Sequence, residues 1–376
     1  MDINFNEDQR MLMDTARRFF EKEAPKSLVR ELVKDENGYS PEVWKKMSEL
    51  GWLGLPFDEE YGGYGGSFLD LAVLLEEMGR AVVPTPFFST VILSGLLIQD
   101  YGTTELKKEY IPRIVEGECI STLAFVGKTG SYSKREIGLE AEPVGASYSL
   151  NGSAFFVPYA HVADMIICAA RMPSTNGADV TLFVVNGKTE GLEAIPLRTI
   201  SGYGSEGVVN LKDVDVSPDH IIGEVGKGWE YIKKLWPRVA AALSCECVGG
   251  MNKVIEMTVN HVNERIQFGR PLSAFQVVQH MCVDMFMKAE TSRYAAYYAA
   301  WLTSEGLECE KEAAIAKAWC GEAFKEVTKI AHQVTGAIGF TEEYDLHLYT
   351  RYAKKLELLF GDGAFHRSVV ADKLGL

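Results

Sequence analysis

The sequence predicts a mainly α-helical protein with a β domain in its middle third. The first third carries apolar side chains at helical spacing, and the same period returns after residue 225. Between these parts the chain consists of short segments rich in β-branched residues, separated by Gly, Pro, Asn and Ser. We therefore expect an N-terminal helical domain, a middle β domain and a C-terminal helical domain, with bounds 1–118, 119–225 and 226–376.

The first third has clear helix start and break signals. Asn6 and Gln9 have the spacing of a capping box, and the apolar side chains that follow them lie on one helical face. The glycine-rich segment YGGYGG at 61–66 then interrupts the pattern, before FLDLAVLLEEMGRA at 68–81 resumes it. Helices are therefore expected on both sides of this segment.

The middle third contains four segments with the composition of strands. They are SYSLNGSAFFV at 147–157, ADMIICAA at 163–170, DVTLFVV at 179–185 and GVVNLKDVDV at 207–216. Just before the last strand, GYGSEG at 202–207 fits the G-x-G-x-x-G pattern of dinucleotide-binding folds. That mechanism needs a helix after the glycines, whereas a strand is expected here, so a turn is favoured over a Rossmann site.

The helical period of the last third is best seen in apolar residues spaced by three and four. These are Phe275, Val278, Cys282, Met285 and Ala289, which share one face of a helix. His280 and Asp284 lie four apart on the same segment, but no third ligand is in register with them, so no metal site is expected. The seven cysteines lack CxxC spacing, which favours reduced thiols over disulfides or a zinc site.

The charge balance limits the classes of partner. Lys and Arg number 38 against 52 Asp and Glu, the formal charge is −14, and no basic block is present. Neither nucleic acid nor an anionic membrane is therefore expected as a partner. The N-terminal MDINFNEDQR is unlike a secretory signal or a transit peptide, and no apolar run reaches the roughly 18 residues of a membrane span. A cytoplasmic location is expected.

The segment HVNERIQFGRPLSAFQVVQHMCVDM at 261–285 resembles the signature of the acyl-CoA dehydrogenase family, R-x-x-F-G-x-x-(I/L)-x-x-F-Q-x-x-x-H-x-x-A-(D/E)-M. The matching residues are Arg265, Phe268, Gly269, Leu272, Phe275, Gln276, His280, Asp284 and Met285. Further similar segments are FDEEYGGYGG at 57–66, ELKKEYIPRIVEGE at 105–118 and QVTGAIGFTEEYDLHLYTRYAKKLELL at 333–359, so the resemblance covers nearly the whole chain. It implies an N-terminal helical domain, a middle β-barrel domain and a C-terminal four-helix bundle.

The resemblance also implies FAD as the cofactor, bound between the subunits of a tetramer. Arg265 would meet the FAD pyrophosphate, because a planar cation suits phosphate. Phe268 belongs to the same signature, and Gln276 matches the family glutamine at the flavin.

Two further segments are expected to contact the cofactor. The run QVTGA at 333–337 matches the family's Q-x-x-G-G loop at the adenine end, with Ala337 in the place of the second glycine. The cofactor contacts predicted there are Gln333, Thr335, Gly336 and Ala337. The strand that usually reads W-(I/F)-(T/S) beside the flavin is represented by FFV at 155–157, so Val157 would replace the hydroxyl residue with an apolar contact.

The stretch LLFGDGAFHR at 358–367 departs from the family pattern. Counting from Arg351, the catalytic glutamate of the family falls on Phe360, which cannot accept a proton. The backbone N–H of that residue serves the thioester oxygen in the family, and this main-chain donor survives the replacement. Asp362 is the nearest candidate base, and the flanking glycines would let the chain bring it in. The other interpretation makes Asp362 a turn residue or a flavin contact, which is common for Asp beside Gly.

Three functions follow from this resemblance. The first is an FAD-dependent acyl-CoA dehydrogenase that removes an α-proton and a β-hydride from an unusual thioester, cyclic, aromatic or dicarboxylic, and passes the electrons to electron-transferring flavoprotein. The second is a non-catalytic subunit that completes the FAD site of a related chain, so the tetramer would be either a homotetramer or a heterotetramer. The third is an oxidase, hydroxylase or thioester lyase on the same fold.

Overall fold

The computed structural model describes residues 5–173, 179–202 and 204–376, and the chain in it forms two compact units. The first unit consists of residues 1–29, 68–83 and 237–376, and the second of residues 30–67 and 84–236. The N-terminal helices are thus shared between the two units. The bounds of the three predicted domains stay a prediction, and the predicted fold class, mainly α with a β domain, is confirmed.

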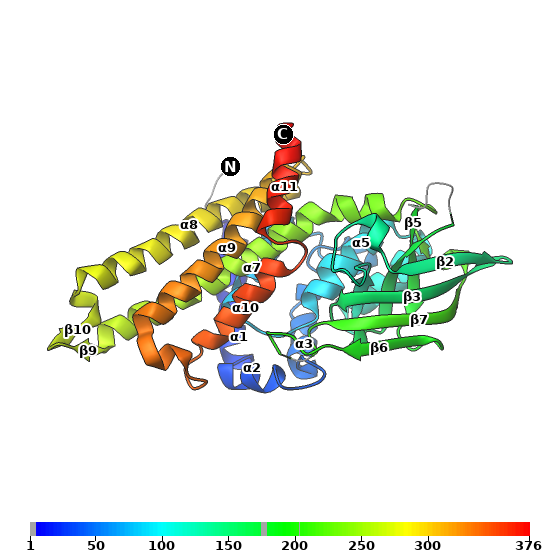
Figure 1. Ribbon diagram of the computed structural model, residues 1–376. Helices are drawn as coiled ribbons and strands as arrows, with labels where there is room; N and C mark the ends of the chain where they lie inside the picture. Colours follow the sequence, from blue (N-terminus) through cyan, green and yellow to red (C-terminus); the bar gives the residue numbers. More distant parts are fainter. Residues whose placement is uncertain (1–4, 174–178, 203) are drawn as a thin grey trace. The chain divides into compact units, whose positions relative to one another are not determined.

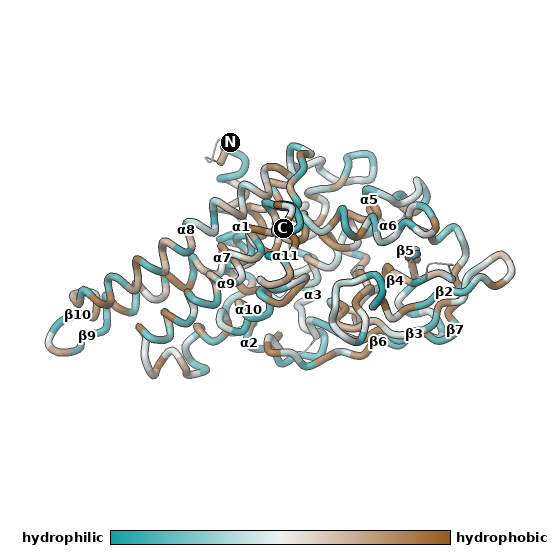
Figure 2. The backbone as a smooth tube through the Cα atoms, turned by 45° about the horizontal axis from the view of Figure 1, so that its top comes forward, coloured by the Kyte–Doolittle hydropathy of each residue, from teal (hydrophilic) through white to brown (hydrophobic). Residues whose placement is uncertain are grey.

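The first unit is helical. Helices α8, α9 and α10 run alongside one another, and α11 crosses them at a steep angle (Figure 1). Helix α9 contacts α8, α10 and α11, while α1 contacts α4. Brown and teal alternate along α8 and α9 in Figure 2, as expected of helices with one apolar face. The helices are α1 (Glu7–Glu23), α4 (Phe68–Ala81), α7 (Gly228–Glu264, in this unit from Pro237), α8 (Gln276–Ser304), α9 (Glu310–Thr335), α10 (Leu346–Leu358) and α11 (Gly363–Leu374).

The predicted capping box at the start of α1 is confirmed. The Gln9 N–H donates to Asn6 Oδ1 at 2.8 Å, and the Asn6 N–H donates to Gln9 Oε1 at 3.2 Å. Two amide groups at the helix start are satisfied in this way, so the helix begins where the sequence predicts it.

Helices α4 and α7 approach each other so closely that only glycine fits at the crossing. A Cβ atom on Gly249 would lie 1.7 Å from the Glu76 carbonyl oxygen, and one on Gly79 would lie 2.1 Å from the Glu246 carbonyl oxygen. The absence of side chains lets the two backbones touch, and the carboxylates of Glu76 and Glu246 come from the same crossing.

The second unit is built on one mixed sheet. The strand order is β6-β7-β3-β2-β4-β5-β8, and β1 pairs in parallel with β4 outside this path. The four strands expected from composition are confirmed as β3, β4, β5 and β7, and β7 directly follows the GYGSEG run, so no Rossmann helix follows those glycines. The strands are β1 (Ser121–Ala124), β2 (Leu139–Val144), β3 (Ser147–Val157), β4 (Met165–Arg171), β5 (Val180–Asn186), β6 (Leu192–Pro196), β7 (Gly207–Val216) and β8 (Ile221–Ile222).

Short helices complete the chain, and a two-stranded hairpin connects α7 to α8. The hairpin strands are β9 (Ile266–Gln267) and β10 (Arg270–Pro271), and the helices are α2 (Lys26–Leu32), α3 (Pro41–Glu49), α5 (Leu96–Tyr101) and α6 (Thr104–Val115). Within the described residues, no helix is both long and apolar enough to cross a membrane.

Candidate active site

The loop between α10 and α11 is the part of the first unit where the sequence departs from the family pattern. Helix α10 ends with the Leu359 N–H donating to the Lys355 carbonyl at 3.0 Å. Phe360 then has φ +56° and Gly361 has φ +102°, so the chain turns through two left-handed residues before α11 begins. A non-glycine residue in this region is strained. Phe360 is also buried, at 4% exposure, so its backbone conformation has to be held by the surroundings.

Two buried side chains hold the carbonyl groups of this loop. Lys317 Nζ, on α9, donates to the Gly361 carbonyl at 2.9 Å and to the Glu357 carbonyl at 3.1 Å. His366 Nε2, on α11, lies 3.1 Å from the Phe360 carbonyl oxygen. Because a carbonyl oxygen only accepts, Nε2 is the nitrogen that carries the proton.

Burial lowers the pKa of both side chains, which favours their neutral forms. Burial lowers the pKa of Lys317 to about 8, although Cys247, Cys320, Glu357 and Asp362 act in the opposite direction. Burial, followed by the charge of Lys317, lowers the pKa of His366 to about 4. His366 is therefore neutral at pH 7, and the neutral tautomer with its proton on Nε2 makes the hydrogen bond to the Phe360 carbonyl.

Asp362 occupies the N-cap of α11. Its Oδ1 accepts a hydrogen bond from the Phe365 N–H at 2.9 Å, and the residue is exposed to solvent. The sequence allows Asp362 to be either a base or a turn residue, and the observed geometry is that of a helix cap rather than of a carboxylate enclosed by apolar groups. The side chain points at its own helix start, which is the contact that a turn residue makes.

The residues predicted to contact the FAD pyrophosphate and the flavin are exposed and lie at or next to the β9–β10 hairpin. Arg265 and Gln276 are exposed, and Phe268, at the hairpin tip with φ +52°, is 90% exposed. The backbone of Arg265 is fixed on both sides, because its N–H donates to His261 and its carbonyl accepts from Leu272, each at 2.9 Å. A planar cation and an aromatic face therefore project from a rigid base.

The predicted adenine loop lies at the end of α9. Gln333 and Ala337 are exposed, whereas Thr335 is buried. The Thr335 hydroxyl donates to the Ala331 carbonyl at 2.9 Å, so this hydroxyl is already used within α9 and does not face a ligand. Gly336 has φ +67°, and a Cβ there would meet no atom within 4 Å. Ala337 lies in the 3-10 helix Gly336–Phe340, which accommodates alanine where the family has its second glycine.

These two groups of residues lie at the same end of the first unit, because α8 begins where the antiparallel α9 ends (Figure 1; Figure 2). An exposed cation, an exposed aromatic ring and a glycine with open space beside it suit a ligand with phosphate and aromatic parts. The residues present therefore fit FAD.

Val157 lies in the second unit and differs from the other predicted cofactor contacts. It is 1% exposed and belongs to the apolar core of the sheet. The neighbouring Phe156 has φ +54° and is 45% exposed, at an irregularity in the β3–β7 pairing. The side chain of Val157 is thus occupied by core packing, and its backbone is paired with Gly207 of β7, so the structure does not present this side chain for the contact predicted from the sequence.

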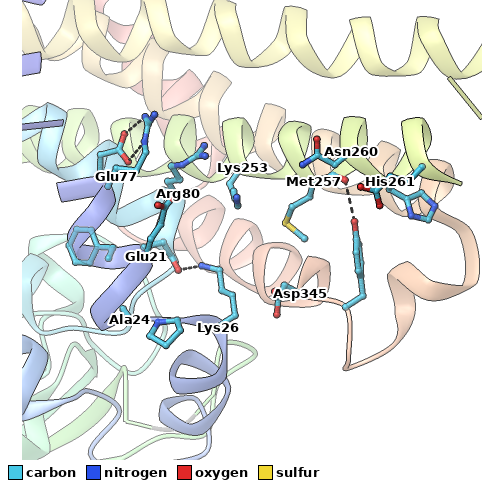
Figure 3. Close-up of a pocket in the computed structure, with 16 residues that line it drawn as sticks. Glu21, Ala24, Lys26, Glu77, Arg80, Lys253, Met257, Asn260, His261 and Asp345 are labelled. Carbon is cyan, nitrogen blue, oxygen red and sulfur yellow. Dashed lines mark hydrogen bonds and ion pairs between the residues drawn. The ribbon is translucent and has the colours of Figure 1, made fainter. Parts of the chain in front are cut away.

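A pocket of about 550 Å³ lies in the first unit between α1, the end of α4, α7 and the residues before α10 (Figure 3). None of the predicted site residues lines it. Its basic groups are engaged with acidic or carbonyl groups: Arg17 pairs with Glu77 at 2.6 Å, and Lys26 donates to the Ala81 carbonyl. Since acidic and basic side chains are balanced around it, the pocket shows no charge preference and we assign it no ligand.

The histidines, cysteines and carboxylates of the described ranges form no group of three or more that could hold a metal ion. All seven cysteines are free thiols, and six of them are buried. Six of the thiols therefore lie in the core, and Cys282 on α8 is partly exposed.

Comparison with known proteins gives consistent matches. Residues 6–118 match the model of the acyl-CoA dehydrogenase N-terminal domain, and residues 226–375 match that of the C-terminal domain. The chain is 28% identical to a short-chain specific acyl-CoA dehydrogenase of Clostridium acetobutylicum, with all of both chains covered. It is 25% identical to the caffeyl-CoA reductase-Etf complex subunit CarC of Acetobacterium woodii, covering 98% of this chain and 99% of that one. The solved structure of butyryl-CoA dehydrogenase from Megasphaera elsdenii superposes with a TM-score of 0.94 at 25% identity, with all of both chains covered.

Proposed function

Since the chain belongs to the acyl-CoA dehydrogenase family of FAD-dependent oxidoreductases, we propose that it dehydrogenates an unusual acyl-CoA thioester at the α,β bond. The observation that carries this proposal is the left-handed loop at Phe360, held by Lys317 and His366, because it would leave a main-chain N–H at the position where the family has its catalytic glutamate. A ring in place of a carboxylate supports a reshaped pocket and hence a cyclic, aromatic or dicarboxylic acyl group.

The chain's own residues would act mainly by binding and orientation. The Phe360 N–H is the proposed donor to the thioester oxygen, where negative charge grows as the α-proton passes to solvent water, since Phe360 has no proton acceptor and the Asp362 carboxylate caps α11. Arg265, Phe268, Gln276 and the 333–337 loop would hold FAD, which supplies the acceptor for the β-hydrogen. A main-chain donor held by buried groups needs no reorganisation during the reaction, which is what makes such a donor effective.

We propose a homotetramer as the assembly and electron-transferring flavoprotein as the electron acceptor. Apolar side chains on α8, including Val283, Phe286 and Met287, are each more than half exposed. Such a stripe suits a contact between helices of two subunits. The Etf complex named for the Acetobacterium woodii relative supports the acceptor. The cytoplasmic location expected from the sequence stays a prediction.

The decisive test is an anaerobic titration of the purified, FAD-containing protein with butyryl-, cyclohexanecarboxyl-, 3-phenylpropionyl- and glutaryl-CoA, following the flavin absorbance. We expect one of the last three thioesters to bleach the flavin, since the site chemistry is that of the family and the pocket is altered at residue 360. Failure of all four with a yellow protein would contradict the proposed reaction. A colourless protein that gains colour only with a related chain would instead support a subunit that completes a partner's site.

Replacing Asp362 with asparagine is expected to leave both the fold and the flavin response nearly unchanged. The amide oxygen of Asn can accept the hydrogen bond from the Phe365 N–H as the carboxylate does, whereas Asp362→Ala removes the cap and should cost about 1 kcal/mol of stability. Melting temperature and thioester-induced bleaching would be measured for both variants. Loss of bleaching in a stable Asp362→Asn protein would identify Asp362 as the catalytic base.

A further inference from the structure

Lys317 is a buried lysine that has no role in the proposed reaction as described so far. It is 1% exposed in the middle of α9, and its ammonium donates hydrogen bonds to two main-chain carbonyls. Burying an ammonium group is costly unless its donors are satisfied, so a lysine in this position needs a compensating role. Leucine or methionine would fill the same space without that cost.

The two carbonyls that Lys317 bridges lie on either side of Phe360. Glu357 belongs to the last turn of α10, and Gly361 follows Phe360 directly. One ammonium group therefore ties the end of the helix to the loop across the strained residue. The third carbonyl, that of Phe360 itself, is taken by His366, which is also 1% exposed.

Fixing these carbonyls fixes the peptide planes of the loop. A peptide unit is planar and trans, so its N–H points opposite to its C=O. The Phe360 N–H belongs to the Leu359–Phe360 peptide unit. This unit lies between the held carbonyl of Glu357 on one side and those of Phe360 and Gly361 on the other, so it cannot rotate far without straining or breaking buried hydrogen bonds. The left-handed conformation of Phe360 is less stable than the right-handed one, and these hydrogen bonds offset that cost.

We propose that Lys317 and His366 are positioning residues, which hold the Phe360 backbone in the conformation that presents its N–H to the thioester oxygen. This inference rests on the proposed function for the identity of the substrate. The clamp itself is a property of the loop and can be tested with or without a thioester.

The test compares Lys317→Met with Lys325→Met in the FAD-containing protein. Methionine keeps most of the length and apolar volume of lysine but removes the donors. Lys325 is the matched control, because it lies two turns farther along α9 and contacts the same residue, Glu357, through the side-chain carboxylate at 2.7 Å. Its ammonium group pairs with the Glu357 side chain rather than with a carbonyl of the loop, and its side chain is 44% exposed.

Two readouts separate the clamp from general stability. The first is amide hydrogen exchange in the peptide that spans residues 356–366, which we expect to speed up at least tenfold in Lys317→Met and to stay at the wild-type rate in Lys325→Met. The second is the thioester titration, in which Lys317→Met should need at least tenfold more of the active thioester for half-bleaching, or bleach at least tenfold more slowly, at unchanged FAD content. A lost hydrogen bond involving a charged donor has about this effect.

Each outcome bears on a different part of the inference. Unchanged exchange in Lys317→Met would overturn the clamp. Faster exchange with a wild-type thioester response would overturn the positioning role. A wild-type protein that no thioester bleaches overturns the proposed function, and the exchange comparison then still decides whether Lys317 holds the loop.

His366 provides a second pair of variants in case Lys317→Met does not fold. Glutamine can still donate an N–H to the Phe360 carbonyl, whereas leucine cannot. We expect His366→Gln to recover most of the thioester response that His366→Leu loses. Equal responses from the two variants, with equal exchange in the loop, would overturn the role of His366.

Discussion

The Glu246→Gln variant is expected to be more stable than the wild-type protein above pH 7 and nearly equal to it below pH 4.5. Glu246 lies on α7 and is 5% exposed, and its carboxylate accepts a hydrogen bond from the Tyr352 hydroxyl on α10. Burial raises the pKa of Glu246 to about 7, against the opposing effects of the Tyr352 hydrogen bond and the charge of Lys355.

The direction of this pH dependence follows from the difference in the pKa of Glu246 between the folded and unfolded states. The folded protein binds this proton more tightly than the unfolded chain, whose glutamate has the ordinary value of 4.5. The stabilising contribution is therefore complete below pH 4.5, decreases as the pH rises, and is lost once the pH passes 7. The difference between the two pKa values corresponds to about 3 kcal/mol. Glutamine keeps an acceptor for Tyr352 and has no charge to bury, so it does not suffer this loss.

The measurement is the melting temperature of both proteins at several values between pH 5 and pH 8, at fixed protein concentration and with FAD bound. We expect the difference in melting temperature between Glu246→Gln and the wild type to increase as the pH rises. Glu256→Gln is the matched control on the same helix. Burial alone would raise the pKa of Glu256, but hydrogen bonds from Lys253 and Arg80 outweigh it and lower the pKa. That variant should lose stability at neutral pH, and a gap of the same sign for both would contradict the prediction.

Much of the fold was predictable because its signals are local. Residues close in the sequence determine several elements. These are the capping box at Asn6, the strands at 147–157 and 207–216, and the start of α11 at its N-cap Asp362. The close crossing of α4 and α7 was not predicted. It depends on Gly79 and Gly249, which are far apart in the chain, and nothing in their local sequence shows that they face each other.

In the candidate site, too, the residues of a local motif could be predicted from the sequence, whereas the long-range contacts could not. A motif match predicted Arg265 and the 333–337 loop as cofactor contacts, and that role stays a prediction. The hydrogen bonds of Lys317 to residues 40 and 44 positions away could not be predicted from the sequence. A lysine among alanines on α9 looks like a solvated face, and only the packing shows that it is buried. Asp362 had two interpretations from the sequence because a helix N-cap and a base share the same residue type. Its hydrogen bond from the Phe365 N–H supports the N-cap, and the Asp362→Asn variant tests the base.

Replacing Arg265 with alanine is expected to weaken FAD binding by about tenfold to a hundredfold while leaving the fold intact. The side chain is exposed, so its removal leaves no cavity, and the hydrogen bonds of its backbone to His261 and Leu272 do not depend on the guanidinium. A hydrogen-bonded ion pair between Arg and phosphate has this strength, and its planar geometry makes lysine an incomplete substitute. Arg265→Lys should therefore lie between the alanine variant and the wild type.

Arg270→Ala is the control, because Arg270 lies on the same hairpin and carries the same charge. Its guanidinium lies 4.1 Å from the centre of the Phe275 ring, so it already has an intramolecular partner. The FAD content per chain after gel filtration and the FAD dissociation constant of the deflavinated protein would be measured for all three variants, each at two salt concentrations. A specific contact to the pyrophosphate requires a large effect for Arg265→Ala and a small one for Arg270→Ala. Similar losses for both, with a strong salt dependence, would mean that only the local positive charge of the hairpin matters, and unchanged binding in Arg265→Ala would remove this residue from the cofactor site.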